Sequence, residues 1–447
     1  MKNFPLIKKN EKTIRKNIKK IKIIKLKNNN NLKIISSSGI LGIYEYLNKL
    51  KIMEIIDKIY KENTNKKGKY GDNKLFVMSL LAIIDGVSRI DDISKWISKN
   101  KEIAKEIGLN TIPSTEVIYG FFKRSGKTKL MELLRELNKK LIIENYINEY
   151  LSEENDNNIL VEIDATFMKS DKKEAKFNYK KEKSYSVLLE HIGEDRLVFD
   201  FEFRDGNVHP GKNIDKMLSE TFRYMKDKKI LFVSDSAGYN KDVIDVVEDN
   251  GSNYIIKMKK SERLLSNANI IGTKWERYDK GTYLFDGDYV FGSNKDMKNI
   301  RVIYINNMEL FGDDGICTNL DYNYSKEEIY KIYRDRAKEE LSIGELKHGY
   351  SLCYVPSKYE TINNFFTFLN TFGYNIIKLL QKGLLSKSIV IDKKIRYVSI
   401  KRFRLLFIDI AGKLSKSSRK LYLNLNLTLE HFSLFEKIFN YCFGFIV

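Results

Sequence analysis

Two acidic residues stand at or near the ends of segments that the sequence predicts to be strands. Asp164 lies late in a short apolar run, Asn158 to Phe167, and Asp235 directly follows another, Ile230 to Ser234. Both runs have the length and apolar content of buried strands. Functional side chains of open α/β sheets collect at the carboxyl ends of strands. An Asp in this position can instead cap the next helix, so neither residue alone identifies a site.

A predicted helix near residue 340 adds a carboxylate flanked by two cations. Tyr333, Arg336, Glu340 and Lys347 are separated by two, three and six residues. At about 100° per residue, all four positions of an α-helix fall within an arc of roughly 60°. One helix face would then carry the Glu between Arg and Lys. The alternative is an exposed helix with ordinary ion pairs.

Three carboxylates suit the cleavage of a phosphodiester bond. Cleavage by water needs a nucleophile that is activated at neutral pH and a leaving oxygen whose charge is stabilised, and two metal ions about 4 Å apart supply both. Mg²⁺ prefers oxygen ligands and keeps several waters, so a few carboxylates and a substrate phosphate are enough to bind it. His191, His209, His348 and His431 show no zinc spacing.

Composition favours a polyanionic partner. The 447 residues include 79 Lys and Arg against 59 Asp and Glu, a net charge of +20. Nucleic acid is the first expectation for such a charge, and an anionic membrane surface is the weaker one. Hydrophobic residues make up 43% of the chain, which excludes a wholly disordered protein. No apolar run is long enough to span a membrane, and three Cys do not form a disulfide framework.

Changes in pattern along the chain predict six regions. Helical periodicity comes first, then strands alternating with helices, then a Gly-punctuated β pattern, and then long helices. The expected regions are a basic flexible arm (1–35), a helical DNA-binding domain (36–155), the first part of an α/β core with a mixed five-stranded sheet (156–259), a β-rich insertion (260–324), the second part of the core with the helix of Glu340 (325–387), and a basic and helical C-terminal region (388–447).

Together these features resemble the DDE transposases of bacterial insertion sequences, most closely DDE domain group 1. The resemblance covers roughly residues 39–440. Besides Asp164, Asp235 and the Tyr-Arg-Glu-Lys helix, it rests on Ile90-Asp91-Asp92-Ile93, Pro113-Ser114-Thr115, Arg204-Asp205-Gly206-Asn207, Asp235-Ser236-Ala237-Gly238-Tyr239, Arg402 to Arg404 and Ser417-Ser418-Arg419. One departure is Ala165 after the first Asp, where Ser is common in the family. The resemblance implies an RNase H-like catalytic core.

The resemblance also implies roles for individual residues. Asp164, Asp235 and Glu340 would be the catalytic metal ligands for two Mg²⁺ ions, with Mn²⁺ as a substitute, and Asp164 would bridge the ions. Arg336 and Lys347 would hold the DNA backbone, by a bidentate fork and a point charge respectively. Tyr333 would contact DNA near the cut or face the core. Trp275 in the insertion would stack on a flipped base or pack the insertion's own core.

The expected activity is therefore DNA transposition: cutting at the ends of the protein's own element and joining the 3′-OH ends to target DNA. The expected partners are double-stranded DNA, at terminal inverted repeats and at the target, and a second copy of the chain in the synaptic complex. No membrane partner is expected, and the expected location is the bacterial cytoplasm at the nucleoid. Three alternatives remain open: an RNase H-like nuclease without strand transfer, a silent DNA-binding protein derived from a transposase, and a generic basic RNA-binding protein.

Overall fold

The structure is a computed structural model. It describes residues 21–25, 33–64, 69–148, 158–226, 228–262, 264, 266–267, 275–292, 297–307, 312–391, 398–417 and 420–444. Most of the predicted basic arm lies outside these ranges, as do the start of the basic segment at Lys393 and the pair Ser418-Arg419. No helix in the described ranges is long and apolar enough to cross a membrane.

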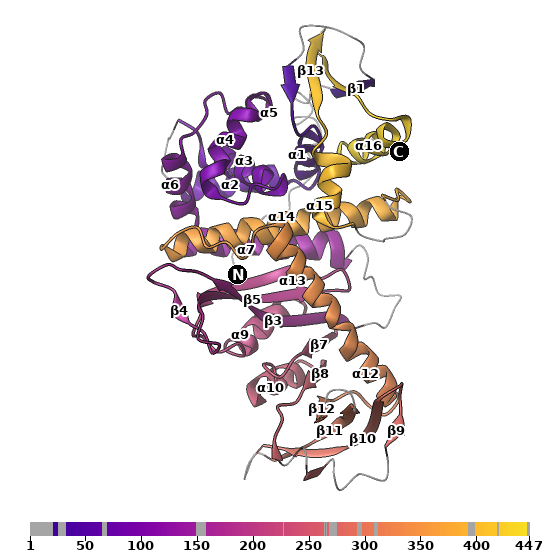
Figure 1. Cartoon of the computed structure of the whole chain (residues 1–447). Helices are drawn as coiled ribbons and strands as arrows, with labels where there is room; N and C mark the ends of the chain where they lie inside the picture. Colours follow the sequence, from indigo (N-terminus) through magenta and orange to yellow (C-terminus); the bar gives the residue numbers. More distant parts are fainter. Residues whose placement is uncertain are drawn as a thin grey trace.

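The N-terminal region is helical, as its periodicity predicted. Most of its longer helices bury one face, whereas the helix over Asp72–Ile84 is buried on all sides from Leu75 onward. Helices α3 (Asp72–Ile84) and α6 (Thr115–Ser125) pack against α14 (Glu360–Ser386), which separates them from the sheet, whereas α7 (Thr128–Ile142) contacts both α14 and the sheet (Figure 1). Phe121 and Phe365 meet edge to face with ring centroids 5.3 Å apart, which ties α6 to α14. The helices are α1 (Gly39–Lys49), α2 (Ile52–Asn63), α3 (Asp72–Ile84), α4 (Ile90–Lys99), α5 (Lys101–Glu106), α6 (Thr115–Ser125), α7 (Thr128–Ile142) and the π-helical turn η2 (Ile143–Ile147).

The core of the molecule is the mixed sheet that the sequence predicted. Its strands are β3 (Ile159–Lys169), β5 (Lys183–Ile192), β6 (Leu197–Asp205), β7 (Ile230–Ser234) and β8 (Asn253–Lys257). β5 is antiparallel to both β3 and β6, whereas β3, β7 and β8 are parallel neighbours. The strand order is therefore third, second, first, fourth, fifth, which is the arrangement of an RNase H-like core. Helices α9 (Ile214–Tyr224) and α10 (Lys241–Asp249) connect its later strands.

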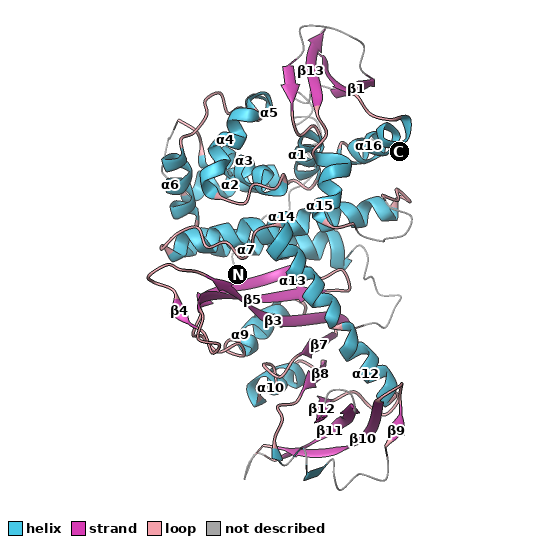
Figure 2. Cartoon of the chain, viewed as in Figure 1, coloured by secondary structure: helices cyan, strands magenta, loops and turns pink. Residues whose placement is uncertain are grey.

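The β-rich insertion extends this sheet instead of forming a separate one. β12 pairs antiparallel with β8, and β11, β10 and β9 follow outward. The sheet thus continues without a break from the catalytic core into the insertion (Figure 2). The sequence predicted the two long strands but not this continuity. The strands are β9 (Glu276–Arg277), β10 (Thr282–Phe291), β11 (Lys298–Asn307) and β12 (Gly312–Thr318), and β4 (Lys176–Phe177) lies at the other end of the sheet.

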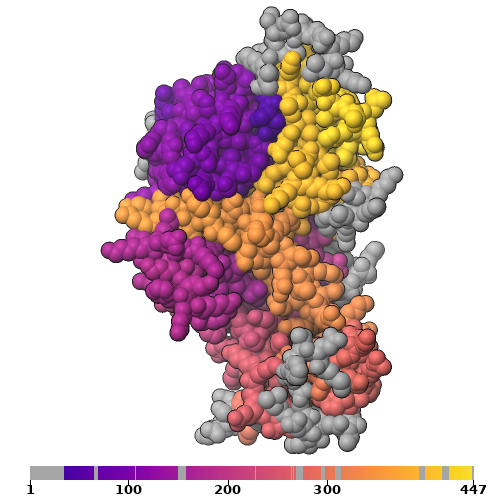
Figure 3. Space-filling model, viewed as in Figure 1, coloured from indigo at the N-terminus to yellow at the C-terminus, as the bar shows by residue number. Residues whose placement is uncertain are grey.

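The chain ends pair in a second, four-stranded sheet that the sequence did not predict. β1 (Ile21–Lys25) and β2 (Lys33–Ile35), from the predicted arm, flank the C-terminal strands β13 (Gly412–Ser417) and β14 (Lys420–Leu425). In Figure 3 the C-terminal region, in yellow, lies beside the N-terminal helices. The remaining C-terminal elements are α15 (Ile400–Phe403), η4 (Arg404–Ile408) and α16 (Leu429–Cys442).

Candidate active site

Adjacent parallel strands bring Asp164 and Asp235 together. Glu162 of β3 is in register with Val233 of β7, and the two Asp residues lie two positions further along their chains. Each carboxylate is oriented by a nearby backbone group. Asp164 Oδ1 accepts a hydrogen bond from the Ala165 N–H at 2.7 Å, and Asp235 Oδ1 accepts one from the Ala237 N–H at 2.8 Å. Asp235 directly follows β7, as predicted. Asp164 is not at the end of its strand, because β3 continues to Lys169 and stays paired with β5 over these residues.

The helix that carries the third carboxylate is not continuous. The sequence predicted one helix over Ser325 to Lys347, whereas the structure has α12 (Lys326–Asp335) and α13 (Ala337–Gly349), which meet at Arg336. Figure 1 shows the two helices following one another across the sheet and the insertion. At the junction, the Arg336 N–H donates to the Tyr333 carbonyl and the Glu339 N–H to the Arg336 carbonyl, at 3.1 and 2.8 Å.

This junction changes which glutamate faces the two aspartates. Hydrogen bonds three residues apart wind the chain at 3.0 residues per turn, so Tyr333, Arg336 and Glu339 stack on one line. The Glu339 side chain is 1% exposed and shares the Arg336 guanidinium with Asp164. Glu340 lies about 100° further round the helix and is exposed. The structure therefore brings Glu339, and not the expected Glu340, close to the two aspartates, because the uniform α-helix behind the 60° arc is interrupted at Arg336.

The three carboxylates carry more negative charge than the nearby cations offset. Arg336 Nη1 lies 3.5 Å from Glu339 Oε2 and 3.9 Å from Asp164 Oδ2. Burial, reinforced by the charges of Glu339 and Asp235, raises the pKa of Asp164 to about 7. Burial also raises the pKa of Glu339 to about 7, although Arg336 and Arg196 oppose the shift. Bringing like charges together out of water is costly, and a bound cation would relieve that cost.

Buried polar residues of the sheet contact Glu339 and its surroundings. His191 Nδ1 lies 3.1 Å from Glu339 Oε1, and both side chains are almost fully buried. Burial lowers the pKa of His191 to about 4, so its ring is neutral at pH 7 and its Nδ1–H can donate to the carboxylate. Beside them, Arg196 Nε pairs with Glu162 Oε2 at 2.9 Å, and Arg196 Nη2 donates to the Asp335 carbonyl at the end of α12. These contacts fix α13 against β3 and β5.

The other predicted site residues lie at different distances from the carboxylates. Tyr333 is half-buried, and its raised pKa reflects burial, with Arg336 and Lys257 opposing the shift. Lys347 is half-buried near the end of α13, about 12 Å along the helix axis from Glu339, and the structure does not bring it to the carboxylates. Trp275 is partly buried and meets Phe285 of β10 edge-on, with ring centroids 6.5 Å apart.

The carboxylate cluster fits a hard divalent cation in its chemistry. Its oxygen donors are the ligands that Mg²⁺ prefers, and Asp164, whose side chain is 24% exposed, leaves the cluster open to solvent. Within the described ranges, no three His, Cys, Asp or Glu side chains are arranged so that they alone could hold a metal ion. Metal and substrate phosphate would therefore have to complete the coordination together, as is usual for Mg²⁺.

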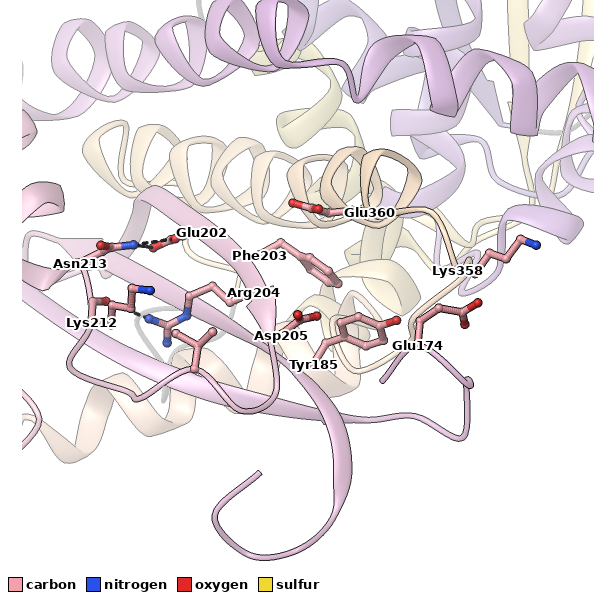
Figure 4. A pocket seen from close by; sticks show the side chains of 11 residues that line it. Glu174, Tyr185, Glu202, Phe203, Arg204, Asp205, Lys212, Asn213, Lys358 and Glu360 are labelled. Atoms are coloured by element: carbon pink, nitrogen blue, oxygen red, sulfur yellow. Dashed lines mark hydrogen bonds between the residues drawn. The ribbon is translucent and has the colours of Figure 1, made fainter. Parts of the chain in front are cut away.

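A cavity of about 340 Å³ opens at the edge strand β6, away from these carboxylates (Figure 4). Arg204 and Asp205 of the predicted Arg-x-Gly-Asn segment line it, together with Tyr185 at the start of β5. In this cavity the Asn213 amide donates to Glu202 Oε1 at 2.8 Å. The motif that suggested family membership therefore shapes the sheet edge and does not contribute to the carboxylate cluster.

The family profile described as "Transposase DDE domain group 1" matches residues 17–442. The chain belongs to this family. The family-level prediction from Asp164, Asp235 and the motif helix is thereby confirmed, as is the RNase H-like fold class. A solved structure, titled "Cryo-EM structure of piggyBac transposase synaptic complex with hairpin DNA", is similar with a TM-score of 0.47 and 8% identity, covering 82% of this chain and 79% of that one. No curated protein matches the chain.

Sequence reasoning about this transposase missed the buried polar residues that support the site. Glu162 and Asp164 are two residues apart on β3, so their side chains point to the same face of the sheet. That spacing was a usable signal for Glu162. His191 offered none, because a single His in an apolar strand pattern is usually a core residue. Glu339 was hidden by its neighbour Glu340, which satisfies the family spacing from Arg336.

Proposed function

We propose that the protein is a DNA transposase that cuts DNA at the ends of its own element and joins the freed 3′-OH ends to target DNA. One observation carries this proposal: three carboxylates, of Asp164, Asp235 and Glu339, lie close together where β3, β7 and α13 meet. The chain also belongs to a DDE transposase family. Asp164 would be the shared ligand, with Asp235 and Glu339 on either side. A divalent metal such as Mg²⁺, in two copies or replaced by Mn²⁺, would activate the attacking oxygen and stabilise the leaving one.

The protein's own groups prepare this site before DNA arrives. The half-buried Arg336 lies close to both Asp164 and Glu339 and offsets part of their negative charge. His191 and the junction at Arg336 hold Glu339 in one orientation, so little reorganisation is needed when substrate binds. Tyr333 lies on the same line as Arg336 and Glu339 and, in this proposal, would contact the DNA strand near the cut.

The substrate would be double-stranded DNA, at terminal inverted repeats and at the target. The net charge of +20 supports a polyanionic partner. In this proposal Lys347 binds the backbone further along α13, and Trp275 contacts DNA from the insertion. A second copy of the chain would hold the other DNA end.

The test uses the full-length protein, Mg²⁺ and linear DNA that carries the sequences flanking its gene. The proposal predicts cuts at the element boundary, joined products with a supercoiled target plasmid, and loss of both on chelation. Asp164→Asn should bind the same DNA and yield neither product. Cutting without joining would replace the proposal with a nuclease. Tight binding by wild type and Asp164→Asn alike, with no cleavage by either, would replace it with a DNA-binding protein.

A further inference from the structure

A lysine-rich hairpin rises from the strand that carries Asp164. We define the lysine hairpin as residues 169–183, which join β3 to β5 and include β4. It contains seven Lys and three acidic residues, a net charge of +4 in fifteen residues. One of the lysines, Lys169, pairs with Glu182 at 2.5 Å, whereas the other six form no ion pair with any residue that the structure describes. The hairpin is therefore a concentrated positive surface that the protein itself does not neutralise.

Two large aromatic side chains near the tip of the lysine hairpin are mostly exposed to solvent. Phe177 is 60% and Tyr179 71% exposed. Lysine ammonium groups flank both rings, with Lys183 Nζ 5.8 Å from the centre of Phe177 and Lys180 Nζ 5.6 Å from that of Tyr179. Exposed aromatic rings among lysines are the combination that binds nucleic acids, because bases or sugars pack on the rings while the cations contact phosphates.

The tip is held in a fixed shape. The Asn178 side chain, between the two aromatic residues, is buried and accepts hydrogen bonds from the backbone N–H groups of Lys180 and Glu182 at 2.9 and 3.0 Å. The Tyr179 ring meets Phe167 of β3 edge-on, with centroids 5.5 Å apart. The aromatic residues therefore project from a rigid base, so binding to them would cost little ordering entropy.

The position of the hairpin relates it to the catalytic carboxylates. On β5, Leu189 is the partner of Asp164 and Lys183 is the partner of Phe177, six residues away. At about 3.3 Å per residue, this separation is roughly 20 Å along the strand. It corresponds to about six base pairs of DNA at roughly 3.4 Å each. Figure 1 shows the loop of β4 extending beyond the rest of the sheet.

We infer that the lysine hairpin binds the DNA whose scissile phosphate occupies the carboxylate site, about six base pairs from the cut. Its lysines contact the backbone, and Phe177 and Tyr179 pack on deoxyribose, because the base faces of a duplex are covered by their stacked neighbours. This inference rests on the proposed function, because it takes the DNA path from the carboxylates. It adds a contact surface outside the motif helix and the insertion.

Affinity measurements separate the aromatic contribution from the ionic one. Binding of full-length protein to a fluorescent 40-base-pair duplex is followed across a salt series. Phe177→Ala with Tyr179→Ala should weaken binding about tenfold at every salt concentration, since stacking is not an ionic contact. Lys173→Gln, Lys176→Gln and Lys180→Gln together should lower the slope of log affinity against log salt by about 2 to 3. The control is Tyr322→Ala, an equally exposed tyrosine (71%) in another region, which should change neither quantity.

Crosslinking locates the contact. With Asp164→Asn as background to keep the DNA intact, Tyr179→p-benzoylphenylalanine should crosslink to DNA about six nucleotides from the cleavage position. Crosslinks between two protein copies, or to no partner while DNA is bound, would overturn the inference in favour of a protein interface or a free surface. Suppose that wild type cuts and joins DNA, while the hairpin variants bind DNA with unchanged affinity and unchanged salt dependence. The inference about the hairpin is then wrong, and the proposed function stands. If wild type neither binds nor cuts DNA, the proposed function fails with it.

Discussion

Two buried charge clusters lie on opposite sides of the same sheet, and they differ in their balance of charge. In the first, which we call the balanced cluster, Asp200 of β6 meets Arg135 Nε and Lys139 Nζ, each at 2.6 Å. Lys139 also pairs with Glu220 of α9 at 2.6 Å. Burial tends to raise the pKa of Asp200, but the two cations outweigh it and lower that pKa overall. Every charge here has a close partner.

The second, which we call the catalytic cluster, has carboxylates in excess. Its carboxylates are those of Asp164, Asp235 and Glu339. Arg336 lies 3.5 Å from Glu339 and 3.9 Å from Asp164, and the pKa values of both carboxyl groups are raised to about 7. Glu190 and His191 are neighbours on β5, yet Glu190 contacts Thr221 of α9 and His191 contacts Glu339 of α13. This difference fits the proposed function, in which the balanced cluster would stabilise the fold and the catalytic cluster would bind a cation and a phosphate.

Removing the buried ammonium group of Lys139 from the balanced cluster should produce the largest loss of stability. Lys139→Met leaves Asp200 and Glu220 without their shared cation, and removing one partner of a buried ion pair costs about 3–5 kcal/mol. Urea unfolding measures this loss. The matched control is Lys140→Met on the same helix, because the pair of Lys140 with Glu136 is at the surface and is worth about 0.5 kcal/mol or less. Equal stability of the two variants would contradict the assigned role of the balanced cluster.

Glu190, next to the balanced cluster, should make stability depend on pH. Burial raises its pKa to about 8 in the folded protein, from about 4.5 when exposed. The folded state therefore binds one more proton between these values, and stability falls as pH rises from about 4.5 to 8. Glu190→Gln should remove a decline of about 4 kcal/mol across this window. Thermal unfolding at pH 5 and pH 8 tests it, and a decline as steep in Glu190→Gln as in wild type would exclude Glu190 as its source.

Loss of His191 should affect the catalytic cluster more than the fold. Without the Nδ1 contact, Glu339 can rotate, and losing such a supporting group typically costs about 10- to 100-fold in activity. Cleavage rates are compared with DNA affinity, which should not change. His191→Asn keeps a donor near the Nδ1 position and should recover part of the rate lost in His191→Ala. If Asn and Ala variants are equally slow, His191 acts only as packing.

The sequence was sufficient for the elements whose patterns are local. The strands of the core were predicted within one or two residues because their apolar runs are short and bounded by turn residues, as in Ile230 to Ser234. Asp164 and Asp235 followed from these strands. The pairing of β12 with β8 and the sheet of the chain ends depend on contacts between distant segments, and such pairing leaves little trace in either partner's sequence.

The third carboxylate shows why spacing alone was insufficient. The family spacing selects Glu340, and a uniform helix would place Glu340 beside Arg336. No Gly or Pro marks the junction between α12 and α13. The tighter turn at Arg336 depends on contacts that hold α12 and α13 separately, such as the Arg196 hydrogen bond to the Asp335 carbonyl. A one-residue change in helix phase follows from such contacts and was not predictable from the motif.

A comparison of Glu339→Gln with Glu340→Gln tests the central claim most directly. Both variants remove one negative charge from neighbouring positions of α13, so effects on folding and on overall charge are matched. We expect Glu339→Gln to lose cleavage by on the order of 10⁴-fold with DNA binding retained, and Glu340→Gln to cleave at nearly the wild-type rate. The reverse result, with Glu340→Gln inactive and Glu339→Gln active, would contradict the assignment of the third carboxylate to Glu339.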